Sequence, residues 1–398
     1  MSILNRRNFS DLRGMARLAV DATVGVTDIV EKMHHTIQLV HPPFGSSRAK
    51  NTRGVTGLVY RSIRGVTRAV GKGLDTGLAP ISFLLPESAS PPSRDAVVSV
   101  INGFYGDHLD RTRNPLAIKM GLRYANEELD PCNPVFGQAD NGSENPNGKL
   151  LVFVHGLCLN ERHWTRDGWD HSQELAKKMG FTPIYLRYNT GLPIAENGKE
   201  LATLLENLTR NWPCPVTRLV LVGHSMGGLV TRSAAFHGGE ANYAWLKHLS
   251  SLVFMGTPHH GAPLERGGNW LDKVLELSPY AAPFAGIGKK RSAGITDLRK
   301  GSITDSCERA VPLPEGVNCY AVAATRAKKE KRIHRQLIGD GLVPVDSALG
   351  TSREPHRCLQ IPATHQWLAF ETGHMELLSC AGAFERLHSW LKEETLDQ

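Results

Sequence analysis

A serine lies between two glycines directly after an apolar run, in the segment RLVLVGHSMGG at residues 218–228. The segment is typical of a strand, a sharp turn and a helix, with Ser225 on the turn. Gly223 and Gly227 suit such an elbow because a Cβ there would clash where neighbouring elements approach closely. An elbow of this kind holds a serine hydroxyl outward, where it can attack an acyl carbonyl. The motif therefore predicts that Ser225 is a nucleophile.

Acyl transfer also needs hydrogen-bond donors for the oxyanion that forms during attack. The amide of Met226 opens the predicted helix and is one candidate. A second candidate follows the earlier apolar run in LLVFVHGLCLN, at residues 150–160. There Gly156 lets the chain turn toward the nucleophile, so that the amide of Leu157 becomes the donor. We interpret the His155 side chain beside them as structural.

The serine needs a base, and the base needs an acid that orients it. Asp340 in LIGDGLVP is the predicted acid, placed after an expected strand and before a glycine turn. His374 in ETGHMELL is the predicted base, on a loop just before the last helix. Asp346 is the competing acid, and His356 and His365 are the competing bases. We interpret His224, in the elbow, as a packing or hydrogen-bonding residue.

Other reactive residues carry weaker signals. His259 and His260 resemble a metal pair, but adjacent loop residues rarely chelate one ion and no third ligand is evident, so no metal and no cofactor are expected. The S-x-x-K spacing in SSRAK at residues 46–50 lacks the companion motifs of that nucleophile class. The seven cysteines are scattered without C-x-x-C spacing, which favours reduced thiols and a cytoplasmic protein over disulfides or zinc.

The residues after 149 predict the elements that must position this site. Apolar, β-rich runs alternate with helical stretches, which is typical of a mostly parallel sheet covered on both faces. The carboxyl ends of such strands are where functional groups collect. The expected strands are residues 150–156, 182–188, 218–224, 251–257 and 318–324, and the expected helices are about 168–179, 196–210 and 226–237.

The first 80 residues differ in character. They hold 12 Lys and Arg against 5 Asp and Glu, so the chain's whole net charge of +7 lies there. Apolar residues recur at helical spacing over residues 10 to about 40 and 51 to 75, with Pro-Pro between them, which predicts a basic amphipathic hairpin. Such a hairpin could pack on the main domain or contact an anionic membrane. Nucleic acid is not expected, because no aromatic residues interleave with the basic ones.

The connecting residues complete the expected domain organisation. Residues 1–80 form the hairpin, 81–148 a linker and helical segment, with a Gly-Asp-His turn inside residues 96–128, and 149–398 the catalytic domain. Hydrophobic content of 41% and charged content of 21% are typical of a soluble globular protein. No apolar run is long enough for a spanning helix, and no secretory signal precedes the hairpin. We expect a cytoplasmic protein that can be peripheral to a membrane.

Together, GHSMGG, VFVHGL, GTPHHGAPLE, DGLVP and GHMELL resemble the α/β-hydrolase superfamily, and within it bacterial lipases and GPI-inositol-deacylase-like esterases. The resemblance covers about residues 149–393. It implies serine ester hydrolysis without a cofactor by Ser225, Asp340 and His374. Related lipases place a calcium-binding aspartate where this chain has Glu376, so calcium is not expected. They also have a lid in the interval that residues 262–312 fill here, although these residues could equally be a helical insertion that closes the core.

The sequence therefore predicts a serine esterase or lipase that cleaves apolar acyl esters through an acyl-enzyme. Two alternatives stay open. An acyltransferase or thioesterase would use the same residues, and a non-catalytic protein could act through the basic hairpin on a lipid surface. Acyl length, alcohol, physiological substrate and oligomeric state are not encoded in these motifs.

Overall fold

The structure is a computed structural model of the 398-residue chain, and two compact units are distinguished in it. It describes residues 6–40, 54–84, 92–136, 146–166, 169–261, 292–305, 311–328, 339–352 and 354–394. One unit comprises residues 1–91 with 109–117, and the other comprises residues 92–108 with 118–398. The larger unit holds every residue that the sequence predicts for catalysis.

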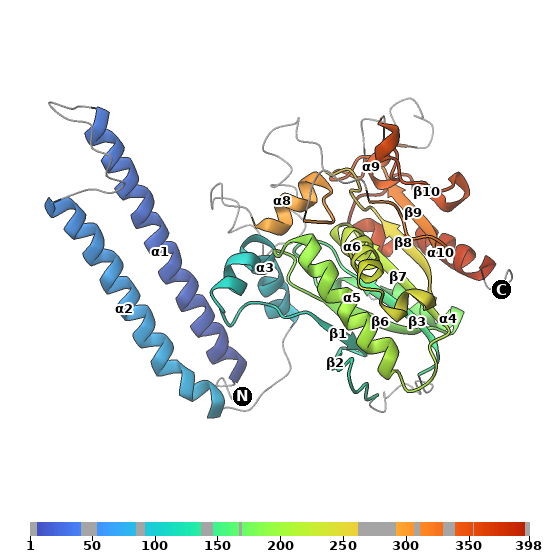
Figure 1. The fold of residues 1–398 in the computed structure, drawn as a ribbon, viewed down its shortest axis with the longest axis horizontal. Helices are drawn as coiled ribbons and strands as arrows, with labels where there is room; N and C mark the ends of the chain where they lie inside the picture. Colours follow the sequence, from blue (N-terminus) through green and yellow to red (C-terminus); the bar gives the residue numbers. More distant parts are fainter. Residues whose placement is uncertain are drawn as a thin grey trace. The chain divides into compact units, whose positions relative to one another are not determined.

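An eight-stranded sheet forms the centre of the larger unit (Figure 1). Its strand order is β10-β9-β8-β7-β3-β6-β1-β2, and all neighbours are parallel except the two pairs that involve β1. The strands are β1 (Gly121–Tyr124), β2 (Glu127–Leu129), β3 (Lys149–Val154), β6 (Thr182–Arg187), β7 (Arg218–His224), β8 (Leu249–Met255), β9 (Asn318–Ala324) and β10 (Gln366–Ala369), beside a separate small pair, β4 (Thr165–Arg166) and β5 (Trp169–Asp170).

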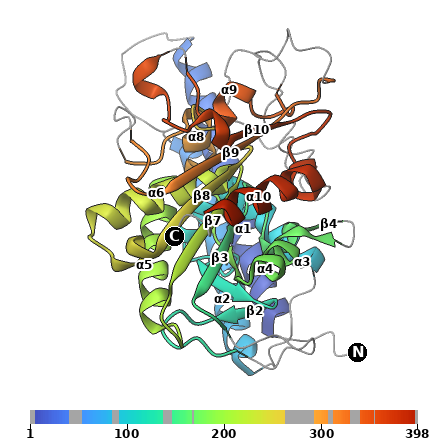
Figure 2. The same ribbon diagram turned by 90° about the vertical axis from the view of Figure 1, so that its right-hand side faces the viewer.

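Helices cover both faces of this sheet, so that side chains alternate between two cores along each central strand (Figure 2). Leu150 and Val152 of β3 pack with α5 and α6, whereas Leu151 and Phe153 pack with α4 and α10. This period of two explains why the central strands read as continuous apolar runs. The helices are α3 (Pro92–Arg111), α4 (His171–Met179), α5 (Ile194–Asn211), α6 (Met226–Glu240), α8 (Ala293–Lys300), α9 (Val345–Ala348) and α10 (Ala381–Glu393), with 3₁₀ turns at Glu161–Trp164, Ala244–His248, Pro355–Arg357, Ala363–His365 and Glu376–Ser379.

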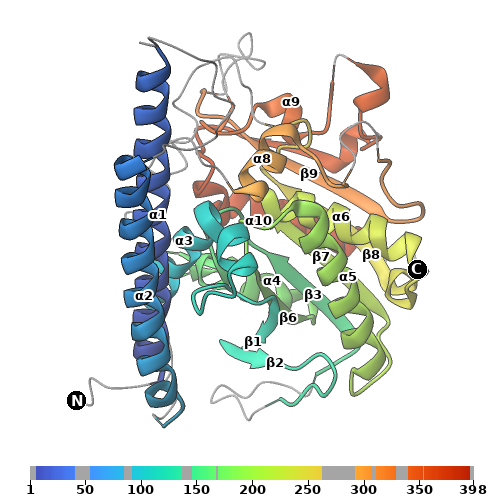
Figure 3. The same ribbon diagram turned by 60° about the vertical axis from the view of Figure 1, so that its left-hand side comes forward.

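The smaller unit contains two long helices, α1 (Arg6–Val40) and α2 (Gly54–Leu84), which lie side by side (Figure 3). Their contact is polar as well as apolar. Arg64 of α2 pairs with Asp28 at 2.9 Å and with Glu31 of α1, and a Cβ on Gly71 would lie 2.6 Å from Cγ2 of Val20. The apolar stripe predicted on the second helix does not fill this contact. It is exposed instead, as is a matching stripe on α1: Leu12, Met15, Val26, Val30, Leu58, Val59, Ile63, Val66 and Val70.

The sequence-based elements are mostly confirmed, with one clear error before the sheet. All five predicted strands and three predicted helices of the larger unit are present. Residues 96–128, however, are not one helical segment with a turn. The expected turn at residues 106–108 is helical within α3, and residues 121–129 form β1 and β2. Leu122 and Leu129 lie opposite each other across this antiparallel pair, and both are buried in the core.

The predicted insertion at residues 262–312 is described only in part. Residues 262–291 and 306–310, and with them most of the expected lid, lie outside the described residues. The described helix α8 belongs to the core, since Ile295 and Leu298 are buried in it and Ser292 caps the helix by accepting a hydrogen bond from the amide of Ile295. This part of the insertion therefore closes the core.

A buried charge network joins the first residue of β7 to the end of α10. Arg218 pairs with Glu394, which also accepts hydrogen bonds of 2.6 Å from the hydroxyls of Ser251 and Tyr320. The side chains of Arg218 and Glu394 are only 4% and 5% exposed. Breaking such a pair leaves a buried charge without its partner.

We predict that Arg218→Met lowers the free energy of unfolding by about 3–5 kcal/mol, the usual range for breaking a buried pair. Denaturant unfolding measures this loss. The control is Lys178→Ala, which breaks an exposed pair with Glu174 at 3.6 Å and should cost less than about 0.5 kcal/mol. Equal losses in the two variants would contradict the assigned role of the network.

Candidate active site

Ser225 occupies a strained turn between β7 and α6. Its backbone has φ 55° and ψ −122°, in the left-handed half of conformational space that serine rarely adopts. The turn is held in place from the neighbouring strand, because the amide of Ser225 donates a 2.8 Å hydrogen bond to the carbonyl of Met255 at the end of β8. The predicted strand–turn–helix geometry is therefore present around this serine.

Glycines make this turn sterically feasible. A Cβ on Gly223 would lie 2.4 Å from the amide nitrogen of Gly228, and a Cβ on Gly227 would lie 2.2 Å from the carbonyl oxygen of Val154 in β3. Real Cβ atoms essentially never come that close to backbone. Gly228 is a third such position, which the sequence reasoning did not single out: its Cβ would meet Oγ1 of Thr257 at 2.0 Å.

The structure brings Asp340 and His374 together. Nδ1 of His374 lies 2.6 Å from Oδ2 of Asp340, and both residues are buried. The other carboxylate oxygen, Oδ1, accepts hydrogen bonds from the amides of Leu342 and Val343 at 2.9 and 2.8 Å. Burial alone would raise the pKa of Asp340, but the neighbouring imidazole of His374, which is also its hydrogen-bond partner, and the two amide donors outweigh it and hold that pKa below its usual value. Asp340 is therefore ionised and positioned to orient the imidazole.

The competing acid and bases lie elsewhere. Asp346 is exposed in the first turn of α9. His356 is exposed beside Glu354 at 3.5 Å, and the ring of His365 lies against Tyr320 with centroids 4.4 Å apart. The geometry thus favours the Asp340–His374 pair over each alternative that the sequence left open.

The residue before the nucleophile fixes the loop that carries His374. Nε2 of His224 lies 3.1 Å from the carbonyl oxygen of His374, and the two rings have centroids 4.8 Å apart. Burial lowers the pKa of His224 to about 3, so its ring is neutral and donates to that carbonyl. A Cβ on Gly256, just after β8, would lie 3.3 Å from Cε1 of His374. The imidazole of His374 is therefore held beside the elbow.

The predicted oxyanion donors flank the same turn. Met226 is the first residue of α6, where an amide has no acceptor within its own helix. Leu157 lies in the loop after β3, and a Cβ on the preceding Gly156 would come within 3.0 Å of Cβ of Ser225. The two loops therefore meet at the serine. Two residues just after β6, which the sequence did not single out, hold the loop that follows β3. The hydroxyl of Tyr188 donates to the carbonyl of His155 at 2.8 Å, and Oγ1 of Thr190 accepts from the amide of Cys158 at 3.2 Å.

The remaining polar residues around the site have structural contacts. The ring of His155 stacks on Tyr188 with centroids 4.5 Å apart, and burial lowers its pKa to about 4. Glu376, at the position of the calcium ligand in related lipases, accepts a 2.7 Å hydrogen bond from the amide of Gly373. Among the described residues, no group of three or more His, Cys, Asp or Glu side chains could hold a metal ion.

The strand order, the helices on both faces and the elbow define an α/β-hydrolase fold. Within this class, residues 145–280 match the family model of the PGAP1-like alpha/beta domain. The matched segment begins just before β3 and includes the elbow. No curated protein sequence matches the chain.

Solved structures that resemble this chain include three hydrolases. The mature lipase BlEst2 of Bacillus licheniformis is 20% identical, with a TM-score of 0.41, over 62% of this chain and 96% of that one. The esterase Pf2001 of Pyrococcus furiosus is 16% identical, with a TM-score of 0.38, over 64% and 85%. The mouse alpha/beta hydrolase domain-containing protein 10 is 14% identical, with a TM-score of 0.37, over 64% and 92%.

We predict that Gly227→Ala destabilises the larger unit by about 3 kcal/mol or more, because its Cβ would collide with the carbonyl of Val154. Thermal unfolding measures the change. Gly239→Ala, in the last turn of the same helix, is the matched control, since its Cβ would meet only Cδ1 of Leu246 at 4.0 Å. That variant should be unchanged or more stable by up to about 1 kcal/mol. A Gly227→Ala protein as stable as the control would disprove the close approach of α6 to β3.

Proposed function

We propose that this protein is a serine carboxylic-ester hydrolase that cleaves apolar acyl esters. The observation that carries the proposal is the buried Asp340–His374 pair, fixed through His224 beside the strained Ser225. The α/β-hydrolase fold, with its nucleophile elbow, supports the same class of reaction. Each of the three residues comes from a different loop at the carboxyl end of the sheet, where α/β proteins assemble their sites.

In the proposed reaction, Oγ of Ser225 attacks the ester carbonyl while Nε2 of His374 accepts the hydroxyl proton. The negative charge of Asp340 stabilises the imidazolium that forms, through the Nδ1–H hydrogen bond. The carbonyl oxygen becomes an oxyanion, which accepts hydrogen bonds from the amides of Leu157 and Met226. His374 then returns the proton to the departing alcohol, and an acyl-enzyme remains. Water attacks that ester with the same base, releasing the acid and restoring Ser225.

We predict that Ser225→Ala and His374→Ala lower kcat for p-nitrophenyl esters by about 10⁴–10⁶, and that Asp340→Asn lowers it by about 10⁴. Rates on acetyl, butyryl and octanoyl esters measure this and report the preferred acyl length. A fluorophosphonate probe should label the wild type at Ser225 and not the Ser225→Ala variant. Equal ester rates in wild type and Ser225→Ala would reject the proposal, and turnover confined to thioesters, or to reactions with an added alcohol, would assign the acyl-transfer alternative.

We further propose that the hairpin brings the enzyme to an anionic lipid surface. The two exposed apolar stripes and the exposed cations Arg61, Arg68 and Lys72 of α2 support this, because interfacial helices combine an apolar stripe with a basic polar face. No helix in the described ranges is long and apolar enough to cross a bilayer. The contact would therefore be peripheral. The cytoplasmic location expected from the scattered cysteines stays a prediction.

We predict that full-length protein floats with phosphatidylserine-containing vesicles and that Val66→Asp with Val70→Asp abolishes this. The control pair, Gly65→Asp with Thr76→Asp, adds the same charge at other exposed positions of α2 and should retain binding. Loss of flotation in both double variants would argue against a lipid-binding apolar stripe. A wild-type protein that does not float would argue against it as well. A lipid-free dimer that only the valine variant dissociates would assign the stripe to a second copy of the chain.

A further inference from the structure

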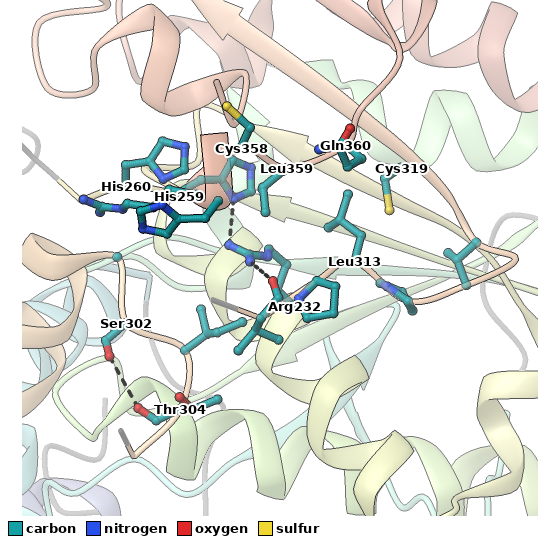
Figure 4. Close-up of a pocket in the computed structure, with 18 of the residues that line it drawn as sticks. Arg232, His259, His260, Ser302, Thr304, Leu313, Cys319, Cys358, Leu359 and Gln360 are labelled. Atoms are coloured by element: carbon teal, nitrogen blue, oxygen red, sulfur yellow. Dashed lines mark hydrogen bonds between the residues drawn. The ribbon is translucent and has the colours of Figure 1, made fainter. Parts of the chain in front are cut away.

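A cavity of about 890 Å³ lies beside α6, and Figure 4 shows residues that line it. Its described lining comes from α6, the loop after β8 and the segments before β9 and β10, and it includes none of Ser225, Asp340 and His374. Arg232 is the α6 residue of this lining. It stands seven positions after Ser225, about 10 Å farther along the helix at 1.5 Å per residue. The cavity is thus a separate site on the same helix.

Arg232 is a buried cation without a described counter-ion. The residue is only 7% exposed. Its Nη2 donates to the carbonyl of Val311 at 3.0 Å, and its Nη1 lies 3.3 Å from Nδ1 of His259. Figure 4 shows Arg232 and His259 among the lining residues. No described carboxylate contributes to the pKa of Arg232, and its Nε has no hydrogen-bond partner among the described residues. Burial lowers the pKa of Arg232 to about 10, so the guanidinium remains charged at neutral pH.

His259 cannot neutralise this charge. Arginine has only donors, so Nδ1 of His259 must accept from Arg232, which leaves the imidazole proton on Nε2. Burial and the neighbouring Arg232 lower the pKa of His259 well below its usual value, so the ring is neutral. Its Nε2–H has no partner among the described residues. Among the described residues, the pair therefore combines a buried positive charge without a counter-ion and a buried donor without a partner, and a bound anion would supply the missing negative charge.

The rest of the lining indicates the kind of anion. The described part of the wall includes the cations Lys300 and Arg357 but no Asp or Glu. Glu354, outside this lining, pairs with Arg357 at 3.9 Å, so the positive charges of Arg232 and Lys300 are the ones that favour a negatively charged ligand. Beside Arg232 the wall is apolar, formed by Ile303, Val311 and Leu313. An inorganic ion would leave this apolar surface uncovered, whereas an anion with a hydrocarbon chain would cover it.

We infer that this cavity binds a small amphiphilic anion, with its carboxylate or phosphate group at Arg232 and its hydrocarbon chain against Leu313. The inference does not depend on ester hydrolysis, because it concerns residues outside the proposed catalytic set. A carboxylate and a phosphate monoester share the chemistry that Arg232 recognises, and the binding experiment distinguishes them.

Isothermal titration of the full-length protein with sodium octanoate, octyl phosphate, octanol and inorganic phosphate tests this. At least one of the two octyl anions should bind at least tenfold more tightly than octanol and inorganic phosphate. Arg232→Gln should weaken that binding at least tenfold. Arg210→Gln is the matched control, since its side chain is 68% exposed on α5 and lies outside the described lining.

A second variant guards against an effect of Arg232→Gln on folding, because this side chain also holds the carbonyl of Val311. Leu313→Trp occupies the space against Leu313 that the hydrocarbon chain would take, without removing a charge, and should also weaken binding at least tenfold, with an unchanged melting temperature. Binding that survives both variants, octanol bound as tightly as octanoate and octyl phosphate, or no binding of either octyl anion to the wild type would overturn the inference. Ester hydrolysis is not the readout, so these outcomes leave the proposed function unaffected.

Discussion

The close approach of the β7–α6 turn to β3 is the constraint on which the rest of the site depends. Only glycine at positions 223, 227 and 228 lets the backbone of α6 begin directly against the strands, and this approach forces Ser225 into its positive φ. The same contact places the loop after β3 beside the serine. The strain is stabilised by the surrounding sheet, whose central strands are buried on both faces.

The His374 loop is held beside this turn by polar side chains that bind its backbone carbonyls. His224 is the last residue of β7 and directly precedes the nucleophile, so one residue position links the elbow to the carbonyl of His374. From the other side, Nη1 of Arg166 donates to the carbonyl of Met375 at 2.7 Å. The base is therefore positioned through its own backbone as well as through Asp340, and three separate chain segments determine where its ring lies.

Much of this arrangement could be predicted from local sequence, because the information is local. The elbow glycines, the apolar strands and the order of Ser225, Asp340 and His374 all appear as short patterns. The features that could not be predicted depend on contacts with residues far away in the sequence. Strands β1 and β2 are short and antiparallel, and they are stable only because β1 pairs with β6. Likewise, nothing near Tyr188 and Thr190 indicates that they hold the loop after β3.

The exposed valines of α2 show a different limit. Their helical spacing correctly indicated a helix. The same spacing is compatible with a buried contact or with an exposed stripe. The contact between α1 and α2 is made by other residues, which include charged side chains and a glycine. Periodicity therefore reports that a surface is apolar. It does not report what covers that surface.

Strand β7 separates two tasks along its length. Ser225 follows its last residue, whereas its first residue, Arg218, is tied to Glu394, Ser251 and Tyr320 in the buried charge network. The first and last of its 7 residues are separated by six steps of about 3.3 Å, which keeps these ends about 20 Å apart. Substitutions in the buried charge network can therefore change the thermal stability of the protein while leaving the geometry around Ser225 intact. Selection on durability and selection on turnover can act on this strand independently.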